Sequence, residues 1–470
     1  MYFFKRNSAI LAVIISVICY FFFAYFLERN QFYRVSFLWI VLFGGFYLLI
    51  QNKKNSFKTL TILAILFRAI FLFATPNLSQ DFYRFIWDGR MLLNGFNPYL
   101  SLPETFIQLN EQPVAQAATL YEGMGKLNGS HYTNYPPLNQ LCFFTAALFG
   151  SKSIVSSIIV FRALIILADI GILYFGKKLL ECLNLPIKNI FLYFLNPFII
   201  IEMTGNLHFE PVMLFFLVWA LYKLHQQQWI FAAILIACSV SVKLIPLLFL
   251  PLFFQWFVHQ DSIETEMKSS QSAQKSIVSK NSIFKITKLS LFYLIILTIT
   301  VLLFLPFYTP ELVGNYSKSV GLWFKDFEFN ASFYYIFRQI GYVFSGYNEI
   351  AFIGKITPIL TVLFLLYLTF FRKNQTIIQL ITAMLFGLCF YYFTATTVHP
   401  WYLATPLILC VFTKYKFPVI WTLVIILTYQ AYANNPWQEN LWFVFVEYLL
   451  VFSCLIYEVF YKLMMQKILK

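Results

Sequence analysis

The chain has 470 residues, of which 60% are hydrophobic, 21% aromatic and only 11% charged. Soluble globular proteins carry about 25% charged residues, so this composition excludes a water-soluble protein with an ordinary surface. Continuous apolar runs of about 20 residues recur along the chain and predict an all-α, polytopic membrane protein with about 12–14 transmembrane helices. The runs are continuous rather than alternating, which favours a helical bundle over a β-barrel.

The net charge of +14 does not indicate a nucleic-acid partner, because the Lys and Arg residues are scattered through short loops between apolar runs. This is the pattern that fixes the orientation of a protein in a lipid bilayer. The 7 Cys residues show no metal-binding or disulfide spacing, and most lie inside apolar runs. We therefore interpret them as small buried hydrophobic residues.

Loop charge gives a topology in which both termini are cytoplasmic. Lys5 and Arg6 precede the first apolar run and place the N-terminus inside, and later basic loops fall on the same side. Pro246 and Pro251 divide the run from 229 to 259 into two short spans that meet near Lys243, and this lone intramembrane cation predicts an anionic partner. The remaining predicted spans are approximately 8–27, 33–50, 57–74, 154–176, 187–204, 211–225, 286–306, 350–371, 376–394, 401–413, 417–433 and 441–461.

We predict a single multispanning unit over residues 1–470, interrupted by three polar segments. Residues 75–153 form a large extracytoplasmic loop, in which Pro136 and Pro137 start a short interfacial or re-entrant helix. Residues 260–285 are rich in Ser, Gln and Lys and predict a flexible cytoplasmic linker. Residues 307–349 form a second extracytoplasmic loop with an amphipathic surface helix.

In this topology the polar residues without an obvious orientation role converge on the outer face. Acids and cations at one mouth suit a reaction that needs a base and a clamp for an anion. No nucleotide-binding glycine motif is present, so the substrate is expected outside or in the lipid. The polar residues that converge on the outer face are Asp81, Arg84, Asp88, Arg90, His131, Tyr135, Glu202, His208, Glu210, Lys243, Arg338 and His399.

Several motifs resemble the GT-C superfamily, specifically its bacterial mannosyltransferase-like multispanning members. The motifs are DFYRFIWDGRMLLNGFNPY at 81–99, YPP at 135–137, NPFIIIEMTGNLHFE at 196–210, KLIP at 243–246 and HPWY at 399–402. The order agrees over most of the chain, and the first motif is the most specific. The chain departs from the family at Glu210, where Asp is expected, and at Ser79, where a paired Asp-x-Asp motif would place an acid. The ligand spacing therefore supports no metal ion.

The resemblance implies transfer of a hexosyl residue, typically mannosyl, from a polyprenyl-phosphate donor to a hydroxyl of a glycan, glycolipid or protein acceptor. The reaction would be an inverting displacement on the extracytoplasmic face of the bacterial inner membrane, without a cofactor, and Asp81 would be its general base. A carboxylate beside apolar surface has a raised pKa and is a better base. The candidates for binding the donor phosphate are Arg84, Lys243, Arg338 and His399. The candidates for binding substrate are Asp88, Arg90, Tyr135, Glu202, His208, Glu210, Trp401 and Tyr402.

Structural interpretations of the same residues remain open. Asp81 and Asp88 are also placed to pair with Arg84 and Arg90, and membrane interfaces are rich in Trp and Tyr whether or not a ligand binds there. The other functional hypotheses are a carrier of lipid-linked sugars, which intramembrane charges would favour, and a sugar-polymer ligase or polymerase. The acid-rich first loop argues against a carrier. A ligase or polymerase is expected, by resemblance to that class, to have its large outer loop late in the chain and not early.

Overall fold

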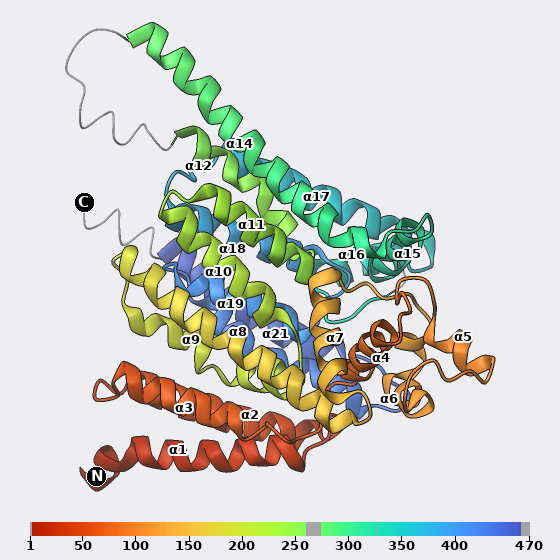
Figure 1. Cartoon of the computed structure of the whole chain (residues 1–470). Coiled ribbons are helices and arrows are strands. Elements are labelled where there is room, and N and C mark those ends of the chain that lie inside the picture. Colours follow the sequence, from red (N-terminus) through yellow and green to blue (C-terminus); the bar gives the residue numbers. More distant parts are fainter. Residues whose placement is uncertain (1, 260–273, 326, 462–470) are drawn as a thin grey trace.

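The computed structural model describes residues 2–259, 274–325 and 327–461, which form one helical bundle (Figure 1). The first half contains α1 (Tyr2–Tyr25), α2 (Phe32–Gln51), α3 (Phe57–Ala69), α4 (Asp81–Leu93), α5 (Pro103–Gln108), α6 (Ala117–Gly129), α7 (Pro137–Gly150), α8 (Ile154–Cys182), α9 (Phe191–Phe194), α10 (Glu210–His225), α11 (Trp229–Val242) and α12 (Phe253–His259). The second half contains α14 (Gln274–Phe304), α15 (Leu312–Lys325), α16 (Phe333–Ser345), α17 (Ile350–Phe370), α18 (Ile377–Thr394), α19 (Ala404–Val411), α20 (Phe417–Val424) and α21 (Leu441–Ile456).

The described residues contain no named strand, and their one strand-like feature is an isolated parallel bridge between Phe329 and Thr397. Within the described residues, six helices are long and apolar enough to cross a membrane, or seven if a bent pair counts as one span, and five shorter apolar helices accompany them. The predicted class, an all-α polytopic membrane protein, is confirmed. The sequence predicts about 12–14 transmembrane helices, short spans included, and the described residues contain fewer helices of full spanning length because some apolar runs are short or broken.

Proline accounts for two of the breaks. The run predicted as one span over 187–204 is bent by 57° between Ile187–Phe194 and Ile199–Gly205, on either side of Pro197. The run from 229 to 259 divides as predicted, because α11 ends at Val242 and a 3-10 segment begins at Ile245. Both breaks leave irregular backbone inside the bundle, where side chains of different helices can meet.

The two predicted outer loops are largely helical. Residues 75–153 fold into α4, α5, α6 and α7, and residues 307–349 contain α15 and α16. Figure 1 shows α4, α5 and α6 with α15 and α16 at one end of the bundle, opposite the end at which α1 begins. The two loops therefore cover the same end of the molecule.

The predicted linker differs from the structure in part. Residues 260–273 lie outside the described residues, whereas α14 begins at Gln274 and includes residues 274–285. The helix starts in a polar sequence because Lys, Ser and Gln are compatible with helical backbone, although they give no apolar periodicity.

Two buried arginines join the helices below the loops. The Nε atom of Arg68 on α3 lies 2.9 Å from Oδ2 of Asp169 on α8, and neither side chain is exposed. Arg162, also on α8, donates instead to backbone oxygens. Its acceptors are the carbonyl oxygens of Leu72, Ala74, Thr204 and Gly205. Arg68 therefore has a buried counter-ion, and Arg162 has four backbone acceptors for its buried guanidinium.

Candidate active site

A cavity of about 730 Å³ lies where the two helical loops meet the bundle. Pockets that hold small-molecule ligands usually enclose roughly 300–1,000 Å³. Residues from both loops, from the α11 break, from α17 and from the segment after α18 line it. Among the predicted site residues, the cavity wall includes Asp81, Arg84, Tyr135, Glu210, Lys243, His399, Trp401 and Tyr402.

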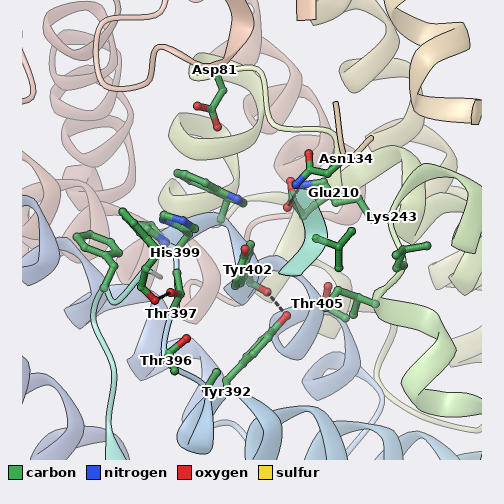
Figure 2. A pocket seen from close by; sticks show the side chains of 18 of the residues that line it. Asp81, Asn134, Glu210, Lys243, Tyr392, Thr396, Thr397, His399, Tyr402 and Thr405 are labelled. Atoms are coloured by element: carbon green, nitrogen blue, oxygen red, sulfur yellow. Dashed lines mark hydrogen bonds and ion pairs between the residues drawn. The ribbon is translucent and has the colours of Figure 1, made fainter. Parts of the chain in front are cut away.

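Asp81 is the first residue of α4, and its carboxylate points into the cavity (Figure 2). Asn128 Nδ2 donates a hydrogen bond of 3.3 Å to Asp81 Oδ1. Burial raises the pKa of Asp81, while this hydrogen bond and the positive charges of Lys243 and Arg29 lower it by less. The result is a carboxyl group with a raised pKa, which makes it a stronger base than a solvated Asp when ionised.

The close packing of α4 on α7 fixes the position of Asp81. The rings of Phe85 and Phe143 stack with centroids 4.7 Å apart. Gly89 faces the backbone of α7, and a Cβ atom there would lie 2.2 Å from the carbonyl oxygen of Phe143. The lack of a side chain at Gly89 therefore lets the two helices approach closely.

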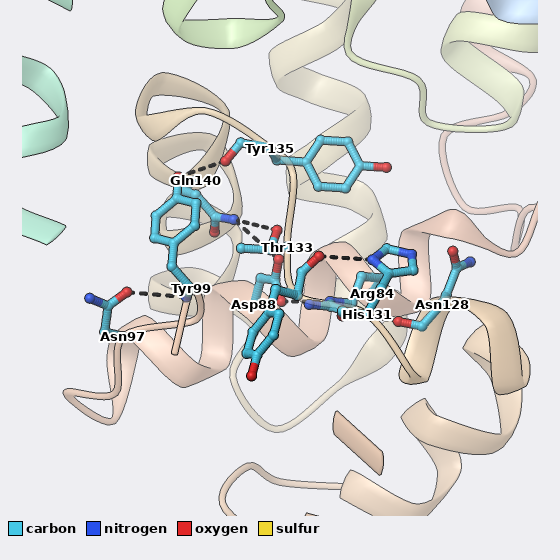
Figure 3. Close-up of polar contacts among 10 residues, drawn as sticks. Arg84, Asp88, Asn97, Tyr99, Asn128, His131, Thr133, Tyr135 and Gln140 are labelled. Carbon is cyan, nitrogen blue, oxygen red and sulfur yellow. Dashed lines mark hydrogen bonds and ion pairs between the residues drawn. The ribbon is translucent and has the colours of Figure 1, made fainter. Parts of the chain in front are cut away.

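Arg84 and Asp88 are neighbours on α4 and form a buried ion pair of 2.8 Å (Figure 3). Gln140 Nε2 donates to Asp88 Oδ2 at 3.1 Å. Arg84 also donates to the carbonyl oxygens of Asn128 and His131, at 2.5 and 2.9 Å. The structural interpretation thus fits this pair, since its charges hold the 127–133 segment against α4.

Lys243 has the anionic partner that the sequence predicts. Its Nζ atom pairs with Glu210 Oε1, which joins the end of α11 to the start of α10. Both side chains are close to the cavity, and Figure 2 shows them on the same wall. The pairing lowers the cost of placing either charge in a largely apolar environment.

His399 lies in an aromatic stack at the base of the cavity. Its ring is 4.5 Å from that of Trp401 and 5.3 Å from that of Phe329, measured between centroids. Burial lowers the pKa of His399 to about 3, with a further contribution from the positive charge of Lys243. His399 is therefore neutral near pH 7 and offers a hydrogen bond, not a positive charge.

Glu202 and His208 support the cavity from behind. Glu202 accepts hydrogen bonds from Tyr429 Oη at 2.5 Å and Asn206 Nδ2 at 3.1 Å. The His208 ring stacks on Trp401 with centroids 4.0 Å apart. Neither Glu202 nor His208 lines the cavity, and the described residues contain no cluster of three or more His, Cys, Asp or Glu side chains suited to a metal ion.

Three other predicted residues also lie outside the cavity wall, and two of them are arginines with local partners. Arg90 donates to the carbonyl oxygen of Ala115 at 2.5 Å. Arg338 on α16 pairs with Glu328 at 2.5 Å, so its charge is balanced within the second loop. The third is Asp88, already described. Three of the candidates for binding the donor phosphate line the cavity, namely Arg84, Lys243 and His399. Arg84 is already held in a buried ion pair with Asp88, which leaves Lys243 and His399.

Sequence reasoning missed Arg29 and the tyrosines of the segment after α20. Arg29 lies between α1 and α2 and lines the cavity together with Tyr429 and Tyr432. The loop that contains Arg29 also contains the acidic residue Glu28, whereas the predicted cytoplasmic loops are basic. This mixed charge is the sequence feature that distinguishes Arg29 from an arginine that only sets the orientation in the membrane.

The sequence model of a known family, described as alpha-(1->6)-mannopyranosyltransferase, N-terminal domain, matches residues 26–259. The match covers about half of the chain and includes Asp81 and Lys243, but ends before His399. No curated protein matches the chain. The match confirms the expected resemblance and identifies a transferase rather than a carrier. The chain therefore belongs to the alpha-(1->6)-mannopyranosyltransferase family, and it is a GT-C-type membrane glycosyltransferase.

Proposed function

We propose that the protein transfers a mannosyl residue from a polyprenyl-phosphate donor to an acceptor hydroxyl on the extracytoplasmic face of the bacterial inner membrane. The observation that supports this proposal is the position of Asp81, a half-buried carboxylate in the lining of a cavity of about 730 Å³ that also includes Lys243 and His399. A base, a cation and a neutral donor at one cavity suit attack by a hydroxyl and departure of a phosphate.

In the proposed step the acceptor oxygen attacks C1 of the sugar while the bond between C1 and the phosphate oxygen breaks. Asp81 takes the hydroxyl proton, and the polyprenyl phosphate leaves with the electron pair of the broken bond. Lys243 and His399 stabilise the negative charge that develops on the phosphate by hydrogen bonds. Attack from the opposite face inverts the configuration at C1, and the step as written uses no metal or cofactor.

The apolar part of the cavity supports a lipid donor. Its lining includes Leu244, Ile245 and Leu248 from the segment after α11, together with Pro358 and Val362 of α17. A prenyl chain buried there would be stabilised by about 25 cal/mol for each Å² removed from water, which a nucleotide-sugar donor would not gain. The acceptor is a glycan, a glycolipid or a protein, recognised by its hydroxyl group.

The test uses protein in nanodiscs with radiolabelled polyprenyl-phosphate-mannose and a cell-envelope glycolipid extract. We expect transfer by the wild type and a loss of about 100-fold or more in Asp81→Asn, which cannot take the proton. Glu111→Gln, an exposed acid of the same loop, is the matched control and should keep full activity. Near-normal transfer by Asp81→Asn would reject the assignment of the base, and transfer from GDP-mannose alone would reject the lipid donor.

A further inference from the structure

Arg29 reaches the cavity from the N-terminal hairpin of the chain. The turn between α1 and α2 is held against the segment before α4, because Asn77 Nδ2 donates to the carbonyl oxygen of Phe23 at 3.1 Å and also to that of Leu27. The turn places Arg29 in the lining of the cavity that also includes Asp81, close enough for its positive charge to lower the pKa of that carboxyl. No role in the proposed transfer has so far been assigned to this arginine.

Two contacts fix the orientation of the Arg29 guanidinium. One Nη atom donates to Gln80 Oε1 at 2.9 Å, and the group lies over the ring of Tyr432, 5.1 Å from its centroid. Gln80 in turn donates from Nε2 to the carbonyl oxygen of Met124 at 2.9 Å, so its amide oxygen faces the arginine. The left-handed φ of +74° at Gly125 shapes the backbone beside this amide.

The cavity cations differ in how their charge is balanced. Lys243 pairs with Glu210, and Arg84 pairs with Asp88. For Arg29, the direct contacts in the described residues are a neutral amide and an aromatic face, while the charge of Asp81 acts on it through the electrostatic field. A guanidinium has five donors, and the bond to Gln80 uses one, so the group presents a fork suited to an oxyanion.

The side of the cavity on which Arg29 lies indicates which substrate it meets. In an inverting displacement the base and the leaving group are on opposite faces of the sugar. Gln80, which holds Arg29, precedes Asp81 in the chain, so the arginine lies beside the base that receives the acceptor's proton. The leaving phosphate then lies away from Arg29, toward other parts of the wall.

We propose that Arg29, oriented by Gln80 and Tyr432, forms an acceptor subsite for an oxyanion, so that the acceptor is a mannoside or glycolipid carrying a phosphate or carboxylate. The inference rests on the proposed function in one respect, the assignment of Asp81 as the base. The bidentate geometry of a guanidinium favours phosphate or carboxylate over a neutral sugar.

The test compares binding of two probes, an alkyl mannoside and the same alkyl mannoside bearing a phosphate, to the full-length protein in nanodiscs without donor. We expect the wild type to bind the phosphorylated probe at least about ten-fold more tightly, since charge-assisted pairs of this kind are strong. Arg29→Gln should remove this preference and leave binding of the neutral probe unchanged, whereas Arg29→Lys should keep part of it. Arg34→Gln, an exposed arginine at the start of α2, is the matched control.

Equal binding of both probes by the wild type, or an equal loss of both in Arg29→Gln, would overturn the proposal. Because no donor is present, this result is independent of whether transfer from polyprenyl-phosphate-mannose occurs. With an active preparation, a rise in KM for the donor but not for the acceptor in Arg29→Gln would assign the arginine to the donor phosphate and would also overturn it.

Discussion

The environment of Asp81 sets the pH at which this residue can accept a proton. Burial raises its pKa, so the ionised base is lost at a higher pH than for a solvated Asp as the solution is acidified. The positive charge of Arg29 opposes this rise. We therefore expect kcat/KM to fall as the pH is lowered, which gives the pH profile an acid limb. Arg29→Gln should move this limb to higher pH.

The measurement is the pH dependence of kcat/KM for transfer by the wild type, Arg29→Gln and the control Arg34→Gln. The limb should move only in Arg29→Gln, because Arg34 is exposed and lies outside the cavity wall. A limb that moves to lower pH, or that stays in place, would show that Arg29 does not lower the pKa of the essential base.

Lys243 and Glu210 form a second unit at the residue scale, with 18% and 3% of their side chains exposed. Lys243→Met leaves the Glu210 carboxylate buried without its cation, which we expect to cost up to about 3–5 kcal/mol of stability. The double variant Lys243→Met, Glu210→Met should recover most of the thermal stability but not the transfer activity. Thermal unfolding in detergent and the transfer assay separate these effects, and recovered activity in the double variant would exclude Lys243 as a phosphate ligand.

At this scale the sequence predicts types of residue better than partners. It predicts an anionic partner for Lys243, but only the fold identifies Glu210, 33 positions away. Helix periodicity puts Arg162 and Asp169 on one face of α8, whereas Asp169 pairs with Arg68, 101 positions away. Such pairs depend on which helices become neighbours, and helix periodicity within one segment carries no information about that.

At the scale of elements, the short segment 327–330 connects the second loop to the cavity. Its Phe329 donates from the backbone N to the carbonyl oxygen of Thr396 at 3.1 Å and accepts from the backbone N of Val398 at 2.8 Å. This short bridge places the ring of Phe329 beside His399. The position of His399 is therefore linked to the position of segment 327–330.

Asn330 fastens the same segment to α21 and to the loop before it. Its backbone N donates to Glu439 Oε1 at 2.7 Å, and its Nδ2 donates to Glu447 Oε1 at 3.1 Å. Its carbonyl oxygen accepts from Tyr448 Oη at 2.7 Å. The residue has a left-handed φ of +47°, a conformation that Asn adopts more readily than most residues.

We expect Asn330→Asp to weaken this attachment, because it replaces a donor with a carboxylate that faces Glu447 and Glu439. Stability should fall by about 1–3 kcal/mol, the range for a buried polar group that loses its hydrogen-bond partner. Transfer should fall with it as segment 327–330 and His399 shift. Asn110→Asp is the control, since Asn110 is exposed and also left-handed, with φ +57°. Unchanged thermal stability and transfer in Asn330→Asp would show that the attachment is not needed.

For the whole molecule, the sequence predicts most helix boundaries where apolar runs end at charged residues or prolines. The predicted spans 376–394 and 417–433 correspond to α18 and to the apolar helix Phe417–Ala433. The prediction for 57–74 is too long, because α3 ends at Ala69 and the apolar residues beyond it are in turns. Hydropathy records burial in an apolar environment, and such burial does not require helical backbone.

The topology is testable with a membrane-impermeant maleimide in intact cells, in a background without the natural cysteines. Glu111→Cys, in the first loop, and Lys54→Cys, in the turn between α2 and α3, are both exposed. Figure 1 shows the first loop and the α2–α3 turn at opposite ends of the bundle. We expect labelling of Glu111→Cys in intact cells and of Lys54→Cys only after permeabilisation, because basic residues stay in the cytoplasm. The reverse pattern would place the cavity on the cytoplasmic side, where a donor displayed outside the cell membrane could not reach Asp81.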